Sequence, residues 1–153
     1  MFYIVYMIEG VYIGLDYGDR RTGVAKSDPT GLIASPLQTV TAKNVGEMVR
    51  HVMAIIDRYQ PVGIVIGYPI SLSGGAAGER CKVVDSFIAL LQKKFPGPIY
   101  KEDERFSSAE AERVIHMHDQ KSGKSKGRID RMAAAIILQT FLDRSRAKNE
   151  GEI

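Results

Sequence analysis

The sequence lacks several features that mark large classes of proteins. It contains one cysteine, Cys81, so no internal disulfide can form, which is typical of proteins in a reducing compartment. The apolar stretch from Phe2 to Ile8 is far too short to span a bilayer, and no basic residue precedes it, so it resembles neither a membrane span nor a signal peptide. We therefore expect a cytoplasmic protein with no membrane partner.

Two familiar ligand signatures are also missing. The glycine-rich segment from Ser71 to Gly78 lacks the Gly-Lys-Ser/Thr ending of a nucleotide-binding P-loop. It could hold a phosphate at a helix start or serve as a plain flexible connection. His116 and His118 are two residues apart in a predicted helix, so they do not share a face and do not form a zinc pair.

What is present suits one compact domain. The chain has 153 residues, of which 44% are hydrophobic and 25% charged. We assign residues 1–10 to an N-terminal extension, 11–143 to the domain and 144–153 to a charged tail that frays. Lys and Arg exceed Asp and Glu by 21 to 18, which allows an anionic partner without demanding one.

Hydrophobic periodicity predicts the element order β-β-β-α-β-α-β-α-α. The first three strands are short and joined by tight turns, which favours an antiparallel meander: Val11–Tyr17, Thr22–Ser27 and Leu37–Val40. Three helices are predicted from start signals and apolar stripes, the first beginning at Asn44, the second carrying Val84 and Phe87, and the third beginning at Ser107.

The later strands are Gly63–Ile66 and Ile99–Asp103. A polar loop from Asp119 to Arg128 precedes the last helix, which carries Ile129, Ile136 and Phe141 on its core side. A meander followed by right-handed β-α-β crossovers gives an α/β fold with a five-stranded mixed sheet in the order 3-2-1-4-5 and helices on both faces. This architecture is ribonuclease H-like.

Three acidic residues fall at one end of this predicted sheet. Asp16 ends the first, central strand, Glu104 follows the last strand, and Asp130 lies in the first turn of the final helix. Taken singly, each has a simpler interpretation: a turn cap, a surface ion pair with Arg105, or a partner for the helix dipole. Together they indicate a site for Mg²⁺ or Mn²⁺, since clustered carboxylates repel unless cations lie between them. Two such ions would activate a water and stabilise the leaving oxygen in phosphodiester hydrolysis.

Asp103 competes with Glu104 for the ligand position, because adjacent strand residues face opposite ways. The last strand should lie about 10 Å from the first, at two ordinary strand spacings. We favour Glu104, whose longer side chain bridges that distance better.

The motifs resemble those of the YqgF family, also called RuvX, a bacterial branch of the ribonuclease H-like nucleases. The resemblance covers Tyr12 to about Leu142, and departs from the family pattern at Ser71, where Asn is frequent, and in the long apolar extension. The matching motifs are Gly14-Leu15-Asp16-Tyr17-Gly18, Ser27-Asp28-Pro29, Gly67-Tyr68-Pro69, Asp103-Glu104-Arg105-Phe106-Ser107-Ser108-Ala109-Glu110-Ala111 and Asp130-Arg131-Met132-Ala133-Ala134.

The resemblance implies a metal-dependent nuclease, acting either in maturation of the 5′ end of pre-16S ribosomal RNA or in Holliday-junction resolution. It carries the catalytic, metal-binding role to Asp16, Glu104 and Asp130. The implied partners are a structured RNA precursor, with ribosomal precursor particles, or branched DNA, bound by a monomer or a homodimer. A non-catalytic RNA- or ribosome-binding factor stays open as a rival. An actin-like ATPase would need two lobes, and this chain supplies one.

Basic residues surround the acidic positions and are candidates for binding a phosphate backbone: Arg20, Arg105, Lys124, Lys126 and Arg128. For the loop residues among them, a solvated surface is an equal alternative, and it is the better interpretation for Arg144, Arg146 and Lys148. No aromatic stripe for base stacking is visible, which favours recognition of backbone or shape over base sequence.

Overall fold

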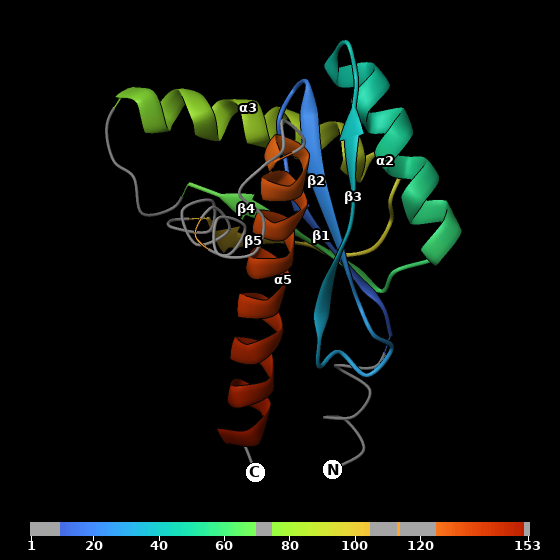
Figure 1. Cartoon of the computed structure of the whole chain (residues 1–153), viewed down its shortest axis with the longest axis vertical. Coiled ribbons are helices and arrows are strands. Elements are labelled where there is room, and N and C mark those ends of the chain that lie inside the picture. Colours follow the sequence, from blue (N-terminus) through green and yellow to red (C-terminus); the bar gives the residue numbers. More distant parts are fainter. Residues whose placement is uncertain (1–9, 70–74, 105–112, 114–124, 152–153) are drawn as a thin grey trace.

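Five strands form one mixed sheet at the centre of the computed structural model, which describes residues 10–69, 75–104, 113 and 125–151 (Figure 1). The strand order is β3-β2-β1-β4-β5, so the predicted order is confirmed. β1 pairs antiparallel with β2, and β2 with β3, whereas β1, β4 and β5 run parallel. The strands are β1 (Tyr12–Asp16), β2 (Arg21–Ser27), β3 (Ala34–Thr41), β4 (Gly63–Tyr68) and β5 (Ile99–Asp103).

The central strands are covered on both faces, which explains their continuous apolar sequences. Ile13 and Leu15 of β1 face the core layer under two helices, α2 (Val45–Tyr59) and α3 (Gly75–Gln92). Tyr12 of β1 and Val65 of β4 face the opposite layer under α5 (Ser125–Gly151). In Figure 1 the long α5 crosses one face of the sheet while α2 lies on the other.

Local signals set the bounds of α2. The Asn44 side chain accepts a hydrogen bond of 2.9 Å from the backbone N–H of Glu47 and so caps the first turn, as the sequence predicts. At the other end, Gln60 adopts a left-handed conformation with φ of 47° and its N–H bonds to the Ile56 carbonyl. Pro61 then prevents the helix from continuing.

The structure differs from the prediction at several boundaries. β3 begins at Ala34, earlier than the predicted Leu37, and α3 already includes Gly75 to Gly78. α5 starts at Ser125, so the predicted polar loop is wrong at its last residues, and the helix continues to Gly151 where a frayed tail was expected. The predicted helix beginning at Ser107, with His116 and His118, lies outside the described residues.

A long-range ion pair helps to explain the extended α5. Arg144 is exposed, as predicted, but its Nη1 donates to Glu102 Oε1 at 2.8 Å, and its Nη2 bonds the second carboxylate oxygen. Glu102 is buried on β5, and a buried carboxylate requires such a partner. Within the described ranges, no helix has the length and apolar character needed to cross a membrane.

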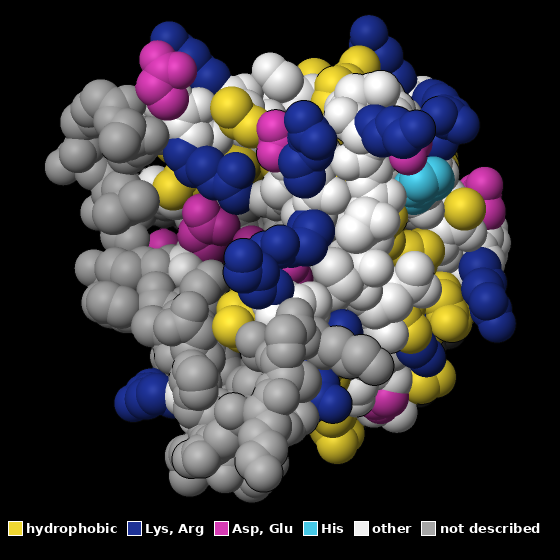
Figure 2. Space-filling model, turned by 45° about the horizontal axis from the view of Figure 1, so that its top comes forward, with side chains coloured by type: hydrophobic (Ala, Val, Ile, Leu, Met, Phe, Trp, Pro, Cys, Tyr) yellow, Lys and Arg dark blue, Asp and Glu magenta, His cyan; other side chains and the backbone are white. Residues whose placement is uncertain are grey.

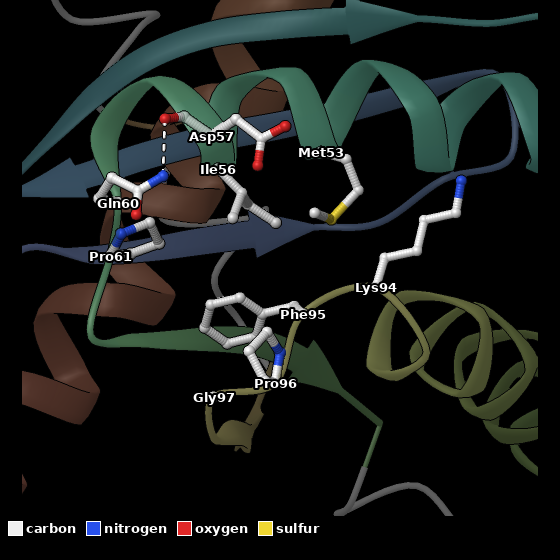
Figure 3. Close-up of a pocket in the computed structure, with 9 residues that line it drawn as sticks. All are labelled: Met53, Ile56, Asp57, Gln60, Pro61, Lys94, Phe95, Pro96 and Gly97. Atoms are coloured by element: carbon white, nitrogen blue, oxygen red, sulfur yellow. Dashed lines mark hydrogen bonds between the residues drawn. The ribbon is translucent and has the colours of Figure 1, made fainter.

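A hollow of about 270 Å³ lies between the end of α2 and the loop before β5 (Figure 3). Ile56 and Met53 line one side and Phe95 the other, and Gln60 donates a hydrogen bond of 2.9 Å to the Asp57 carbonyl at its rim. Pro61, also in the lining, precedes β4. The hollow therefore lies at the amino ends of the parallel strands, away from the predicted acidic site.

Candidate active site

The carboxyl ends of the parallel strands hold two of the three predicted acidic residues. Asp16 is the last residue of β1 and lies in register with Gly23 of β2. Glu104 follows β5, and its backbone N–H donates a hydrogen bond of 3.1 Å to the Tyr68 carbonyl at the end of β4. These pairings fix both backbones at the end of the sheet where β1, β4 and β5 finish. We call this end, with Asp16, Glu104 and Asp130, the acidic edge.

The third acidic residue reaches this edge because α5 packs directly on β2. A side-chain carbon at Gly23 would lie only 1.9 Å from the Asp130 carbonyl oxygen, so only glycine allows this approach. Asp130 lies in the second turn of α5, since the helix begins at Ser125 and has no acidic residue in its first turn. The interpretation of Asp130 as a partner for the helix dipole therefore loses support, because that effect fades beyond the first turn.

The turn after β1 is held by its own side chains. The Thr22 hydroxyl donates to the Gly18 carbonyl at 3.0 Å and accepts from the Gly18 N–H at 3.3 Å. A side-chain carbon at Gly18 would lie 2.4 Å from the Arg21 carbonyl oxygen. The glycine and threonine of this motif thus close the turn tightly, leaving Asp16 at its base.

The other two carboxylates act electrostatically on Asp16. Burial, then the charges of Glu104 and Asp130, raise the pKa of Asp16 to about 7, while the Arg80 guanidinium opposes the increase. Burial also raises the pKa of Glu104, with Arg80 opposing and Asp103 adding to the shift. Asp16 is therefore a carboxyl group that changes charge near neutral pH.

The charge of Glu104 is one of those that raise the pKa of Asp16. Its Oε2 atom lies 3.1 Å from the position that a side-chain carbon at Gly67 would occupy. The absence of a side chain at Gly67 therefore leaves room for the Glu104 carboxylate beside β4.

Two arginines that the sequence analysis did not assign to the site contact these acids. Arg21 Nε lies 2.6 Å from Asp130 Oδ2. Arg80 Nη2 donates to the Tyr17 carbonyl at 2.5 Å, and its Nε lies 3.9 Å from Glu104 Oε1. A signal for Arg80 is present in the sequence, because it extends the apolar stripe of Val84 and Phe87 by one turn towards the start of α3.

The predicted nucleic-acid-binding residues are only partly described. Arg20 is exposed just before β2, and its carbonyl accepts a hydrogen bond of 3.0 Å from Ala42. Lys126 is exposed and Arg128 half-buried in the first turn of α5, while Arg105 and Lys124 lie outside the described residues. Figure 2 shows acidic side chains in a hollow bordered by Lys and Arg side chains.

The chemistry of the donors fits a hard divalent cation, since carboxylate oxygens are the ligands that Mg²⁺ and Mn²⁺ prefer. Among the described residues, however, no three His, Cys, Asp or Glu side chains form a group that could hold one ion. An arrangement without three protein ligands suits the common kind of Mg²⁺ binding, in which one or two carboxylates act together with water and substrate phosphates.

Comparison with known structures agrees with the fold. The chain superimposes on the Thermus thermophilus RuvC in complex with Holliday junction substrate, with a TM-score of 0.62 and 13% identity, covering 92% of this chain and 98% of that one. The Fowlpox virus resolvase, solved with Holliday junction DNA, gives a TM-score of 0.52 at 12% identity, covering 88% and 97%. The protein therefore has the ribonuclease H-like fold of the RuvC-type resolvases.

Sequence comparison then defines the family. The model of the family described as "RuvX: Holliday junction resolvase" matches residues 10–144, and the chain belongs to this family. A relative from Halothermothrix orenii, named "Putative pre-16S rRNA nuclease", is 41% identical over 131 residues, covering 86% of this chain and 93% of the relative. A Koribacter versatilis protein of the same name is 38% identical over 137 residues, covering 90% and 89%. The chain is accordingly a nuclease, a hydrolase of phosphodiester bonds.

Proposed function

We propose that this protein is a divalent-metal-dependent nuclease that cleaves precursor ribosomal RNA during maturation of the 5′ end of 16S rRNA in the cytoplasm. The observation that carries the proposal is the convergence of three carboxylates at one end of the sheet: Asp16 ends β1, Glu104 follows β5, and Asp130 lies where α5 packs on β2. Burial and the charges of the other two acids raise the pKa of Asp16 to about 7, and such perturbed acids are typical of catalytic sites.

In this proposal Asp16, Glu104 and Asp130 hold Mg²⁺ or Mn²⁺, as two ions. When bound, such ions lower the pKa of an attacking water and stabilise the charge on the leaving oxygen. Arg20, Lys126 and Arg128, together with Arg105 and Lys124, attract the phosphate backbone and orient it over the acidic edge. Asp16, whose pKa burial and the neighbouring charges raise to about 7, is mostly ionised above neutral pH and can then bind a cation.

The relatives favour RNA as the substrate, because the names of the Halothermothrix and Koribacter proteins refer to pre-16S rRNA. A second candidate is resolution of Holliday junctions, which the description of the family and the structural neighbours favour. Junction resolution requires two symmetric cuts, so it predicts a homodimer, whereas a monomer suffices for trimming RNA.

The test compares three proteins on a labelled pre-16S RNA fragment and on a labelled four-way DNA junction, each with Mg²⁺ or Mn²⁺. Wild type and Asp16→Asn are compared with Asp19→Asn, which removes an exposed carboxylate from the same turn. We expect cleavage of RNA by wild type and by the Asp19 variant, and a loss of at least about 10²-fold for Asp16→Asn.

Each other result has a defined meaning. Equal cleavage by wild type and Asp16→Asn would place the activity elsewhere or in a contaminant. Preferential cleavage of the junction would support the resolvase. Binding of RNA without any cleavage would favour a non-catalytic ribosome-processing factor, and would overturn the proposal.

A further inference from the structure

Arg80 links the two strand ends that carry Asp16 and Glu104. Its Nη2 donates to the backbone carbonyl of Tyr17, the residue after Asp16, at 2.5 Å. Its Nε lies 3.9 Å from Glu104 Oε1. Since β4 separates β1 from β5, this guanidinium spans the gap between two segments that share no ladder.

The same helix face also fixes the side chain of Tyr17. Phe87, two turns after Arg80 on α3, stacks on the Tyr17 ring with centroids 4.1 Å apart and an interplanar angle of 15°. Tyr17, Val84 and Phe87 are all buried. The ring is thus held in the core and the carbonyl is held by Arg80, so α3 contacts Tyr17 at two points and leaves the segment after Asp16 little freedom.

Arg80 can hold the Tyr17 carbonyl and the Glu104 carboxylate at the same time. Its side chain is 36% exposed and that of Glu104 is 19% exposed, so both are partly shielded from solvent. Only a planar guanidinium offers several donors in fixed directions, which allows one bond to a carbonyl and an ion pair with a carboxylate at the same time. A lysine could satisfy one of these partners but not both.

We propose that Arg80 is a positioning residue, which sets the separation of Asp16 and Glu104 by holding the Tyr17 carbonyl and the Glu104 carboxylate together. The proposal rests on the proposed function for its catalytic consequence, but not for its structural one. A misplacement of about 1 Å can cost about 10²-fold in rate, so losing this clamp should slow the chemical step without weakening substrate binding.

The experiment compares Arg80→Met with Lys82→Met, a matched loss of a cation from an exposed position of the same helix. With pre-16S RNA and Mg²⁺, we expect kcat to fall about 10- to 100-fold in Arg80→Met with KM changed less than about twofold, and no change in Lys82→Met. Arg80→Lys should recover part of the loss in kcat. Hydrogen exchange at Gly18 should be at least about threefold faster in Arg80→Met than in wild type.

The exchange measurement needs no activity, so it separates the two proposals. If wild type cuts no substrate, the proposed nuclease function fails, while faster exchange at Gly18 would still support the clamp. Unchanged exchange would overturn the positioning role. A higher KM with unchanged kcat would also overturn it, and would make Arg80 a phosphate-binding residue. If Arg80→Met does not fold, Arg80→Lys supplies the same comparison.

Discussion

Ionisation of the Asp16 side chain destabilises the folded protein. Its pKa is about 7 in the folded protein and near 3.8 for the free side chain, so the folded state binds the proton more tightly than the unfolded state. Between about pH 4 and pH 7, ionisation of Asp16 therefore lowers the free energy of unfolding. The difference in pKa sets an upper limit of about 4 kcal/mol for this loss.

Because ionisation of Asp16 lowers the free energy of unfolding, wild type and Asp16→Asn should differ in stability in a way that depends on pH. At pH 3 the two proteins should unfold at similar urea concentrations, because Asp16 is mostly protonated in both the folded and the unfolded state. At pH 8 the variant should be the more stable, by an amount below about 4 kcal/mol. Both measurements need EDTA, because bound cations would lower the pKa of Asp16. An equal stability difference at both pH values would contradict the buried, coupled carboxylate.

At the residue scale, the sequence predicted the acids better than their partners. The strand ends indicated Asp16 and either Asp103 or Glu104, because parallel strands bring their carboxyl ends to one edge of the sheet, and the longer side chain favoured Glu104. Arg21 follows the predicted nucleic-acid-binding residue Arg20, but only the structure reveals that Arg21 contacts Asp130. The sequence separation between these partners is large, and no local pattern encodes a contact between β2 and α5.

At the scale of elements, the approach of α5 to β2 depends on one missing side chain. An alanine carbon at Gly23 would lie 1.9 Å from the Asp130 carbonyl oxygen, so Gly23→Ala must push α5 away from the sheet. We expect a loss of about 1–3 kcal/mol in the free energy of unfolding. Cleavage should fall by about 10²-fold, since Asp130 moves with the helix.

Gly78→Ala is the matched control for this variant. Gly78 lies within α3, and a side-chain carbon there would meet nothing within 4 Å. Alanine is favoured over glycine inside a helix by about 0.5–1 kcal/mol, so this variant should be slightly stabilised and fully active. Urea unfolding measures the stability of both glycine variants, and the RNA cleavage assay measures their activity. Normal activity in Gly23→Ala would show that the position of Asp130 is unimportant.

The order of the elements could be predicted because apolar runs, caps and turns are local signals. The start of α5 and its continuation beyond Asp143 could not be predicted from such local signals. The charged residues there resemble a solvated tail, but Arg144 is paired with buried Glu102 of β5. A charge that stabilises a helix through a distant strand leaves no periodic signature in its own segment.

At the scale of the whole molecule, Lys and Arg side chains lie beside the hollow with acidic side chains in Figure 2, so binding of nucleic acid should depend strongly on salt. In EDTA, where no cleavage occurs, the logarithm of the RNA-binding constant should fall linearly with the logarithm of salt concentration. Lys126→Met should reduce the slope by about 0.7, the value for one phosphate contact on single-stranded RNA. Fluorescence anisotropy with a labelled precursor measures this slope.

Lys148→Met provides the comparison, since Lys148 is also exposed on α5 but lies near the opposite end of the helix. The salt dependence of RNA binding should have the same slope in Lys148→Met as in wild type. A reduction of the same size in both variants would indicate that net charge alone, and not the position of Lys126, governs binding.

The direction of α5 also matters for attaching the protein to a surface. The helix begins beside the acidic edge and ends at Gly151, while β1 begins at Tyr12 and runs towards that edge, so both described ends of the chain lie far from it (Figure 1). A biotin tag or a fusion partner at either end should leave the site facing solution. Single molecules tethered in this way could therefore be observed while they bind long, folded nucleic acids.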